Sequence, residues 1–249
     1  MYPDILDMKR FYADYPGLLA REVISKTIQS KTKPHPSQTI LGLGYTSPFL
    51  RPFLGKSRRV LSFAPAAQGV IAWPQNDKIS TALMSEDLLP LPDSCVDILI
   101  LSHILEHTKD INAVMAECKR VLAATGKIII VVPNRSGIWA QLERTPFGYG
   151  RPFSAFQLQQ LLVGANFAVD EITAALFTPP TNNKYVLKFS NQLERLKRWP
   201  FPRVGGVLVA VAHQDIFAPI KGKRIPIQSM VWKPQPIKSY KNTYKNTYK

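Results

Sequence analysis

Cysteine is nearly absent from this 249-residue chain, which holds only Cys95 and Cys118. Two cysteines are too few for a disulfide framework, and they lack the short paired spacing of a zinc or redox motif. No apolar run approaches the roughly 18 residues that a membrane-spanning helix needs. The start, MYPDILDMKRFY, carries acids where a signal peptide has a basic start and an apolar core. We therefore expect a cytoplasmic protein with no membrane partner.

Acidic residues are also scarce, because 17 Asp and Glu stand against 32 Lys and Arg, a formal net charge of +15. Such a charge can attract nucleic acid, anionic lipid or an acidic partner. Eight of the basic residues, and no acidic residue, lie in the low-complexity segment 219–249, which ends in KNTYKNTYK. We therefore expect a mildly basic folded body and, over residues 214–249, a basic disordered tail that contacts anionic partners.

Helical and extended patterns alternate along the rest of the chain. Apolar residues from about Leu18 to Ile28 recur at helical spacing and predict an amphipathic helix that packs against a sheet edge or a cleft. Short apolar runs rich in Ile and Val predict strands covered on both faces. The predicted strands start near residues 39, 58, 97, 127, 167 and 205, and the predicted helices cover residues 110–122, 154–163 and the basic segment 191–199.

The order of these segments predicts the fold class. A strand, a helix behind an Asp110 cap and another strand in succession imply a right-handed parallel crossover. We predict an α/β fold with a Rossmann-like, doubly wound and mostly parallel sheet that ends in an antiparallel strand pair. Its domain spans residues 39–213, behind an N-terminal helical segment over residues 1–38.

The segment ILGLGYTSPF from Ile40 places glycines in the turn after the first predicted strand. A doubly wound domain binds its cofactor at this turn, because glycine lets the backbone approach the ligand and the next helix points its N-terminal amides at it. A tight turn without a ligand explains the same residues equally well.

A more specific pattern is EDLLPLPDSCVDILILSHILEH, residues 86–107, in which LPxxDxxxD precedes a buried strand and LEH. The chain here resembles the class I S-adenosylmethionine-dependent methyltransferases, and CKRVLAATGKIIIVVPN is similar to the family's next helix and strand. The segments PNRSGIW and RTPFGYGRPFS, with the early pair Phe11 and Tyr12, further resemble an uncharacterised bacterial subgroup of type-11 methyltransferases.

The resemblance implies S-adenosylmethionine as cofactor and methyl transfer to an acceptor that is a small molecule, a protein or an RNA. It implies no nucleophilic residue, because the sulfonium is already a strong electrophile and positioning can supply the catalysis. The cofactor residues it implies are Gly42, Gly44, Tyr45, Glu86, Asp87, Leu88, Ser102 and His103. The loops at the strand ends add the predicted acceptor contacts Asn134, Arg135, Trp139, Arg144, Phe147 and Tyr149. An equally good interpretation is that these residues hold a long loop onto the core.

Two departures from the family pattern favour an alternative, a non-catalytic interaction protein of the same fold. The first motif normally has an acid and three glycines, whereas Thr46 and Pro48 follow the two glycines here. The acid that normally follows the second strand and binds the ribose hydroxyls is replaced by SFAPAAQ. A further alternative is RNA methylation, with the basic segment 184–203 and the tail as phosphate contacts.

A remote alternative is a zinc peptidase, because His103, Glu106 and His107 spell the inverted motif HxxEH. That motif needs a sustained helix and a third protein ligand. Here it directly follows a predicted strand, and a new helix begins after Asp110. The sequence therefore predicts no metal.

Overall fold

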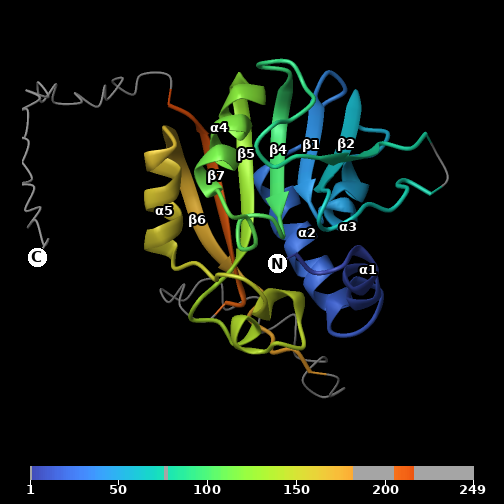
Figure 1. The fold of residues 1–249 in the computed structure, drawn as a ribbon, viewed down its shortest axis with the longest axis vertical. Helices are drawn as coiled ribbons and strands as arrows, with labels where there is room; N and C mark the ends of the chain where they lie inside the picture. The colour runs from blue at the N-terminus through green and yellow to red at the C-terminus, as the bar shows by residue number, and fades with distance from the viewer. Residues whose placement is uncertain (1, 76–77, 182–204, 216–249) are drawn as a thin grey trace, which may run out of the picture. The chain divides into compact units, whose positions relative to one another are not determined.

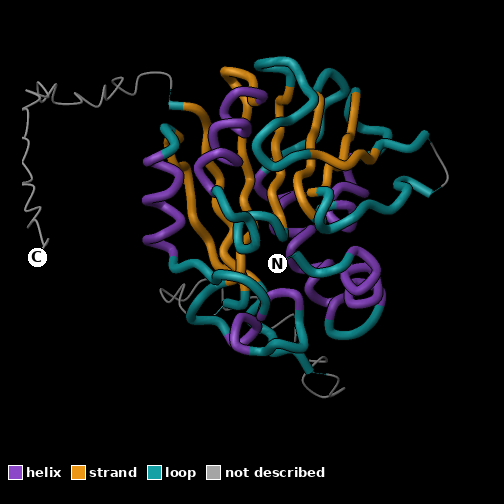
Figure 2. The backbone as a smooth tube through the Cα atoms, viewed as in Figure 1, coloured by secondary structure: helices purple, strands orange, loops and turns teal. Residues whose placement is uncertain are grey.

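The computed structural model describes residues 2–75, 78–181 and 205–215, all within one compact unit that extends over residues 1–218. Its centre is a seven-stranded sheet in the order β3-β2-β1-β4-β5-β7-β6, seen as a single layer in Figure 2. The strands are β1 (Thr39–Gly44), β2 (Arg59–Pro65), β3 (Thr81–Met84), β4 (Val96–Ser102), β5 (Leu122–Pro133), β6 (Phe167–Ala175) and β7 (Val207–Gln214). Strand β7 runs antiparallel to both of its neighbours, β5 and β6, whereas the pairings among β1 to β5 are parallel. The predicted fold class is confirmed.

Five α-helices are described, and their starts follow local capping chemistry. They are α1 (Ile5–Ala13), α2 (Gly17–Lys31), α3 (Ser47–Leu50), α4 (Ile111–Val121) and α5 (Ala155–Gly164). The Asp110 carboxylate accepts hydrogen bonds from two backbone amides of α4, and Ser154 forms a capping box with Gln157 at the start of α5. Short 3-10 helices are η1 (Arg51–Phe53), η2 (Ile138–Gln141) and η3 (Pro146–Gly148).

The sheet is covered on both faces, which explains its continuous apolar strands. In β4, Ile98 and Ile100 pack with the buried residues of α1, α2 and α3. The alternate residues, Leu99 and Leu101, pack with those of α4 and α5. These two helices lie together on the other face of the sheet (Figure 1). The result is the layered α/β arrangement that the runs of Ile, Val and Leu predict.

The strand order reverses between β1 and β4, which are neighbours in the sheet although two strands separate them in the chain. In open α/β sheets, ligands bind at the carboxyl ends of the strands at such a switch point. Helix α1 and the loop after β5 lie at this end, at the bottom of Figure 1.

Helix α1 and strand β3 match no helix or strand predicted from the sequence, and neither do the short helices α3, η1, η2 and η3. The predicted helix 18–28 corresponds to α2, which is longer at both ends. The basic helical segment predicted at 191–199 and most of the predicted tail lie outside the described residues. No helix in the described ranges has the length and apolar character needed to cross a membrane.

Candidate functional site

The glycine turn after β1 brings two strand ends into close contact. Gly44 has a φ of +82°, and a Cβ added to it would lie 2.2 Å from the carbonyl oxygen of Ser102 at the end of β4. Only glycine fits a left-handed conformation with a neighbouring backbone this near. Gly42 is needed for a different reason, because a Cβ there would lie 2.1 Å from Oγ1 of Thr46 and disturb the packing of the turn.

A hollow opens beside this turn, and we call it the first hollow. It is bounded by the β1 turn, the end of β2, helices α1 and α2, and the segment 70–75. Its described charged residues are Lys9, Arg21 and Arg51, all of them basic. The remaining lining residues are Ile5, Tyr12, Ala13, Gly44, Tyr45, Ser47, Pro48, Ser62, Ala64, Val70, Ile71, Ala72, Trp73 and Gln75. The hollow thus combines aromatic rings, exposed main chain and positive charge at the switch point.

Tyr12 of α1 lies at the centre of this region and links the two predicted cofactor segments. Its hydroxyl is 2.7 Å from Nε2 of His103, and its ring stacks on Tyr45 with centroids 5.4 Å apart. Burial raises the pKa of Tyr12 well above its usual value, and burial raises the pKa of Tyr45 to about 12 against the opposing charge of Arg21. Both phenols therefore stay protonated at neutral pH.

The other predicted cofactor residues divide into buried and exposed groups. Ser102 is 1% exposed, and its Oγ has no hydrogen-bond partner among the described residues. Glu86, Asp87 and Leu88 form the turn after β3 and do not line the first hollow; Leu88 is 67% exposed. Burial raises the pKa of the Tyr2 phenol, and the nearby Glu86 carboxylate raises it further.

A second hollow lies on the other side of α1. It is lined by Tyr2, Pro3, Asp7, Met8, Phe11, Arg144, Pro146 and Tyr149. Two predicted acceptor residues, Arg144 and Tyr149, are therefore found together there. Along α1, Lys9 and Tyr12 line the first hollow, while Asp7 and Phe11 line the second.

The other four predicted acceptor residues lie elsewhere in the loop after β5. Asn134 is buried and donates from Nδ2 to Gly205 O over 2.7 Å, and Trp139 donates from Nε1 to Thr178 O over 2.8 Å. Phe147 is buried against Trp139, with ring centroids 5.5 Å apart. Arg135 is exposed and lines neither hollow. The contacts of the three buried residues fix the loop to the sheet.

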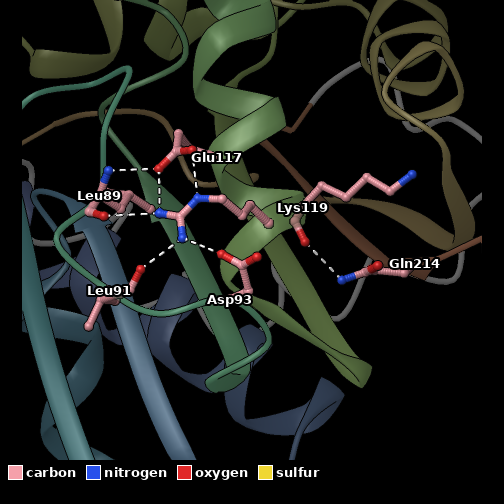
Figure 3. Close-up of polar contacts among 7 residues, drawn as sticks. Leu89, Leu91, Asp93, Glu117, Lys119 and Gln214 are labelled. Atoms are coloured by element: carbon pink, nitrogen blue, oxygen red, sulfur yellow. Dashed lines mark hydrogen bonds and ion pairs between the residues drawn. The ribbon is translucent and has the colours of Figure 1, made fainter.

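An arginine network explains the LPxxD segment of the sequence (Figure 3). The Arg120 guanidinium of α4 donates to both oxygens of Glu117, to Asp93 and to the carbonyl oxygens of Leu89 and Leu91. The backbone amide of Leu89 donates to Glu117 over 2.8 Å. Hydrogen bonds from Arg120 hold the pKa of Glu117 below its usual range. The network ties the segment after β3 to α4, so these motif residues support the site without lining the first hollow.

Several lining residues carry no recognisable motif in the sequence. Lys9, Arg21 and Trp73 line the first hollow but belong to segments in which a basic or aromatic residue is unremarkable. The only signal for Arg21 was the helix 18–28, predicted to pack against an edge or a cleft. The structure also shows what replaces the acid that the family normally has after the second strand. Strand β2 ends with Ala64 and Pro65, and the hollow has Ser62 and Ala64 on that side.

Comparisons with known proteins agree on the domain. Residues 44–130 match the type-11 family described as "Methyltransferase domain". A probable S-adenosylmethionine-dependent methyltransferase of Mycobacterium tuberculosis is 35% identical over 94 residues, which cover 37% of this chain and 34% of that protein. The match thus spans about a third of the relative's length.

Solved structures share the fold. A Thermotoga maritima S-adenosylmethionine-dependent methyltransferase, described as a possible histamine N-methyltransferase, aligns with a TM-score of 0.58 and 16% identity over 83% of this chain and 91% of that one. A geranyl diphosphate methyltransferase in complex with S-adenosylmethionine aligns with a TM-score of 0.53 and 14% identity over 77% and 84% of the two chains. Residues 44–130 are therefore similar to a type-11 methyltransferase domain, and the chain shares the fold of solved S-adenosylmethionine-dependent methyltransferases.

Proposed function

We propose that this protein is an S-adenosylmethionine-dependent methyltransferase that binds its cofactor in the first hollow. The observation that carries the proposal is the close approach of Gly44 to Ser102, which leaves bare main chain at the switch point of a sheet with this family's strand order. Any side chain at position 44 would collide with the Ser102 backbone, so only glycine lets these two strand ends lie this close beside the hollow.

The residues around the hollow suit the chemical groups of the cofactor. Tyr45 and Trp73 offer ring surfaces for a purine, and Arg21 offers a cation for the methionine carboxylate. The buried Ser102 Oγ, which lacks a partner among the described residues, is a free donor or acceptor at the end of β4. Gly44 and Tyr45, which line the hollow, are thus the predicted cofactor residues that we retain for direct contact, whereas the buried Ser102 is not among its lining residues.

The ribose must be bound without the usual carboxylate. The hydroxyl of Ser62 is the polar group on the β2 side of the hollow, but it already lies 3.3 Å from Oγ1 of Thr46 and 3.4 Å from Oγ of Ser47. Neutral hydrogen bonds are weaker than charge-assisted ones, so we expect a lower cofactor affinity than in relatives that keep the acid. Methyl transfer then depends on how the hollow orients the bound cofactor, and Tyr12 and Tyr45 are the residues that we expect to orient it.

We further propose that the second hollow binds a remote part of the acceptor, because α1 lies between the two hollows and the acceptor atom itself must lie beside the cofactor methyl in the first. Pro3, Met8, Phe11 and Pro146 make this hollow largely apolar, while Arg144 and Tyr149 add a cation and a phenol at its wall. This composition suits an apolar molecule that carries an anionic or planar group.

The function is tested by incubating the protein with labelled S-adenosylmethionine and fractionated cell extract, and asking which fraction gains label. The Arg144→Ala variant should transfer less label at a fixed extract concentration, whereas Arg135→Ala, a matched change outside both hollows, should behave as wild type. If Arg144→Ala and the wild type turned over equally per folded molecule, Arg144 would have no role in binding the acceptor. Cofactor binding without transfer to any fraction would favour the interaction protein, and label in RNA that depends on residues 184–203 would favour the RNA enzyme.

We place this activity in a cytoplasmic protein whose domain covers residues 39–213. Both cysteines are free, and Cys118 is buried. That state suits a reducing compartment. The basic tail is proposed as a contact for anionic partners, and its removal should weaken such binding in a salt-dependent way.

A further inference from the structure

The segment HILEH after β4 forms a compact turn. His103 follows the last residue of β4 and has a φ of +55°, so the chain reverses there. The backbone amide of His107 then donates to Ile104 O over 3.1 Å. The sequence argued against a metal here because two histidines at this spacing were expected to need a helix. The turn brings the side chains together without one.

Three potential ligand groups converge in this turn. One donor atom each from His103, Glu106 and His107 lies within 4.8 Å of the others, and the residues are 1%, 2% and 6% exposed. The Nδ1 atom of His103 is 3.3 Å from Oε1 of Glu106. Ligands of one tetrahedral ion with bonds near 2.0 Å lie about 3.3 Å apart, so this pair already has the required separation.

The Glu106 carboxylate is the group that most needs an explanation. Neither of its oxygens has a hydrogen-bond partner among the described residues, and no described Lys or Arg forms an ion pair with it. A buried carboxylate without donors is costly, and such groups are normally paired or bound to a metal. Both oxygens are buried beside two imidazoles, which are common metal ligands.

Neighbouring residues orient His103 and Glu106, as the residues around a metal site orient its ligands. The Tyr12 hydroxyl lies 2.7 Å from Nε2 of His103 and fixes that ring with Nδ1 toward Glu106. Metal-bound histidines almost always use their second nitrogen in this way. The backbone of Glu106 is also fixed, because its carbonyl oxygen accepts from the amide of Arg151 over 2.9 Å.

We propose that His103, Glu106 and His107 bind a divalent first-row transition metal such as Zn²⁺. Two imidazoles and one carboxylate suit these ions, whereas Mg²⁺ and Ca²⁺ prefer all-oxygen sites. Three protein ligands leave a coordination position open to water or to another molecule. The ring of Tyr2, which lines the second hollow, lies 5.4 Å from the ring of His107, so the metal adjoins that hollow.

The test titrates the full chain, stripped of metal with a chelator, with Zn²⁺ and with Co²⁺. We expect one equivalent to bind with a Kd of about 1 µM or tighter, and the Co²⁺ form to show visible absorption. Glu106→Gln keeps the shape but removes the charge, and should weaken binding at least about tenfold. The control His213→Gln removes a half-exposed imidazole beside Asp170 and should bind as wild type.

X-ray absorption of the Zn²⁺ form of the wild-type protein decides the ligands even where a variant fails to fold. The proposal expects nitrogen and oxygen neighbours, with imidazole scattering and no sulfur. Sulfur at the metal would assign the ion to a cysteine instead. That result would overturn the proposal. Unchanged metal affinity in a folded Glu106→Gln variant would also overturn it, as would the absence of binding at a metal concentration about 100-fold above the expected Kd. None of these measurements depends on the proposed methyl transfer.

Discussion

Replacement of Gly44 by alanine tests the contact on which the first hollow depends. The substitution forces a non-glycine residue into a φ of +82° and puts its Cβ 2.2 Å from the Ser102 carbonyl oxygen. The left-handed conformation costs about 1–2 kcal/mol, and an overpacked contact with backbone costs about 1–3 kcal/mol more. We expect Gly44→Ala to lower the free energy of unfolding by about 2–5 kcal/mol, measured by urea denaturation with circular dichroism.

Gly55 supplies the matched control for this prediction. Its φ is +70°, but a Cβ there would meet no atom within 4 Å. Gly55→Ala should therefore show only the conformational cost of about 1–2 kcal/mol. The difference between the two variants measures the clash with β4. Equal destabilisation by the two substitutions would refute the argument that the strand ends require glycine at position 44.

Further predictions concern the residues that support the site. Tyr12→Phe should lower the free energy of unfolding by about 1 kcal/mol, because it keeps the stack on Tyr45 but removes the hydroxyl from buried His103; unchanged stability would contradict this hydrogen bond. Glu117→Gln should destabilise the protein at pH 7. Because the folded-state pKa of Glu117 is lowered, its contribution is present above the unfolded value of about 4.3 and disappears as the pH falls through the folded pKa, so the wild-type and variant stabilities should converge in acid. If the difference in stability between the wild type and Glu117→Gln stayed constant from pH 7 to pH 3, the charge of Glu117 would not be its source.

The sheet was predictable because its signals are local. Continuous Ile, Val and Leu runs identified the buried strands, and the caps Asp110 and Ser154 marked helix starts that the structure confirms. Strand β3 escaped prediction because it has only four residues, of which Leu83 is half exposed. Helix α1 has only nine residues, so its buried Met8 and Tyr12 lie within fewer than three helical turns, too few for a clear periodic pattern.

The site was less predictable because several lining side chains come from elements far apart in the chain. The glycine turn identified Gly44 and Tyr45, which do line the first hollow. Nothing near Tyr12 in the sequence indicates that it reaches His103, which is 91 residues away. Conversely, the residues of the loop after β5 look alike in the sequence. Only the packing separates Arg144, at the second hollow, from Trp139, which is buried in the core.

Isothermal titration of the wild-type protein with S-adenosylmethionine tests the central claim most directly. The account predicts saturable binding of one molecule per chain, weakened in Arg21→Ala and retained in Gly55→Ala, whose substitution lies away from the first hollow. The absence of any binding heat, with no cofactor-induced rise in the melting temperature of the same wild-type sample, would contradict it.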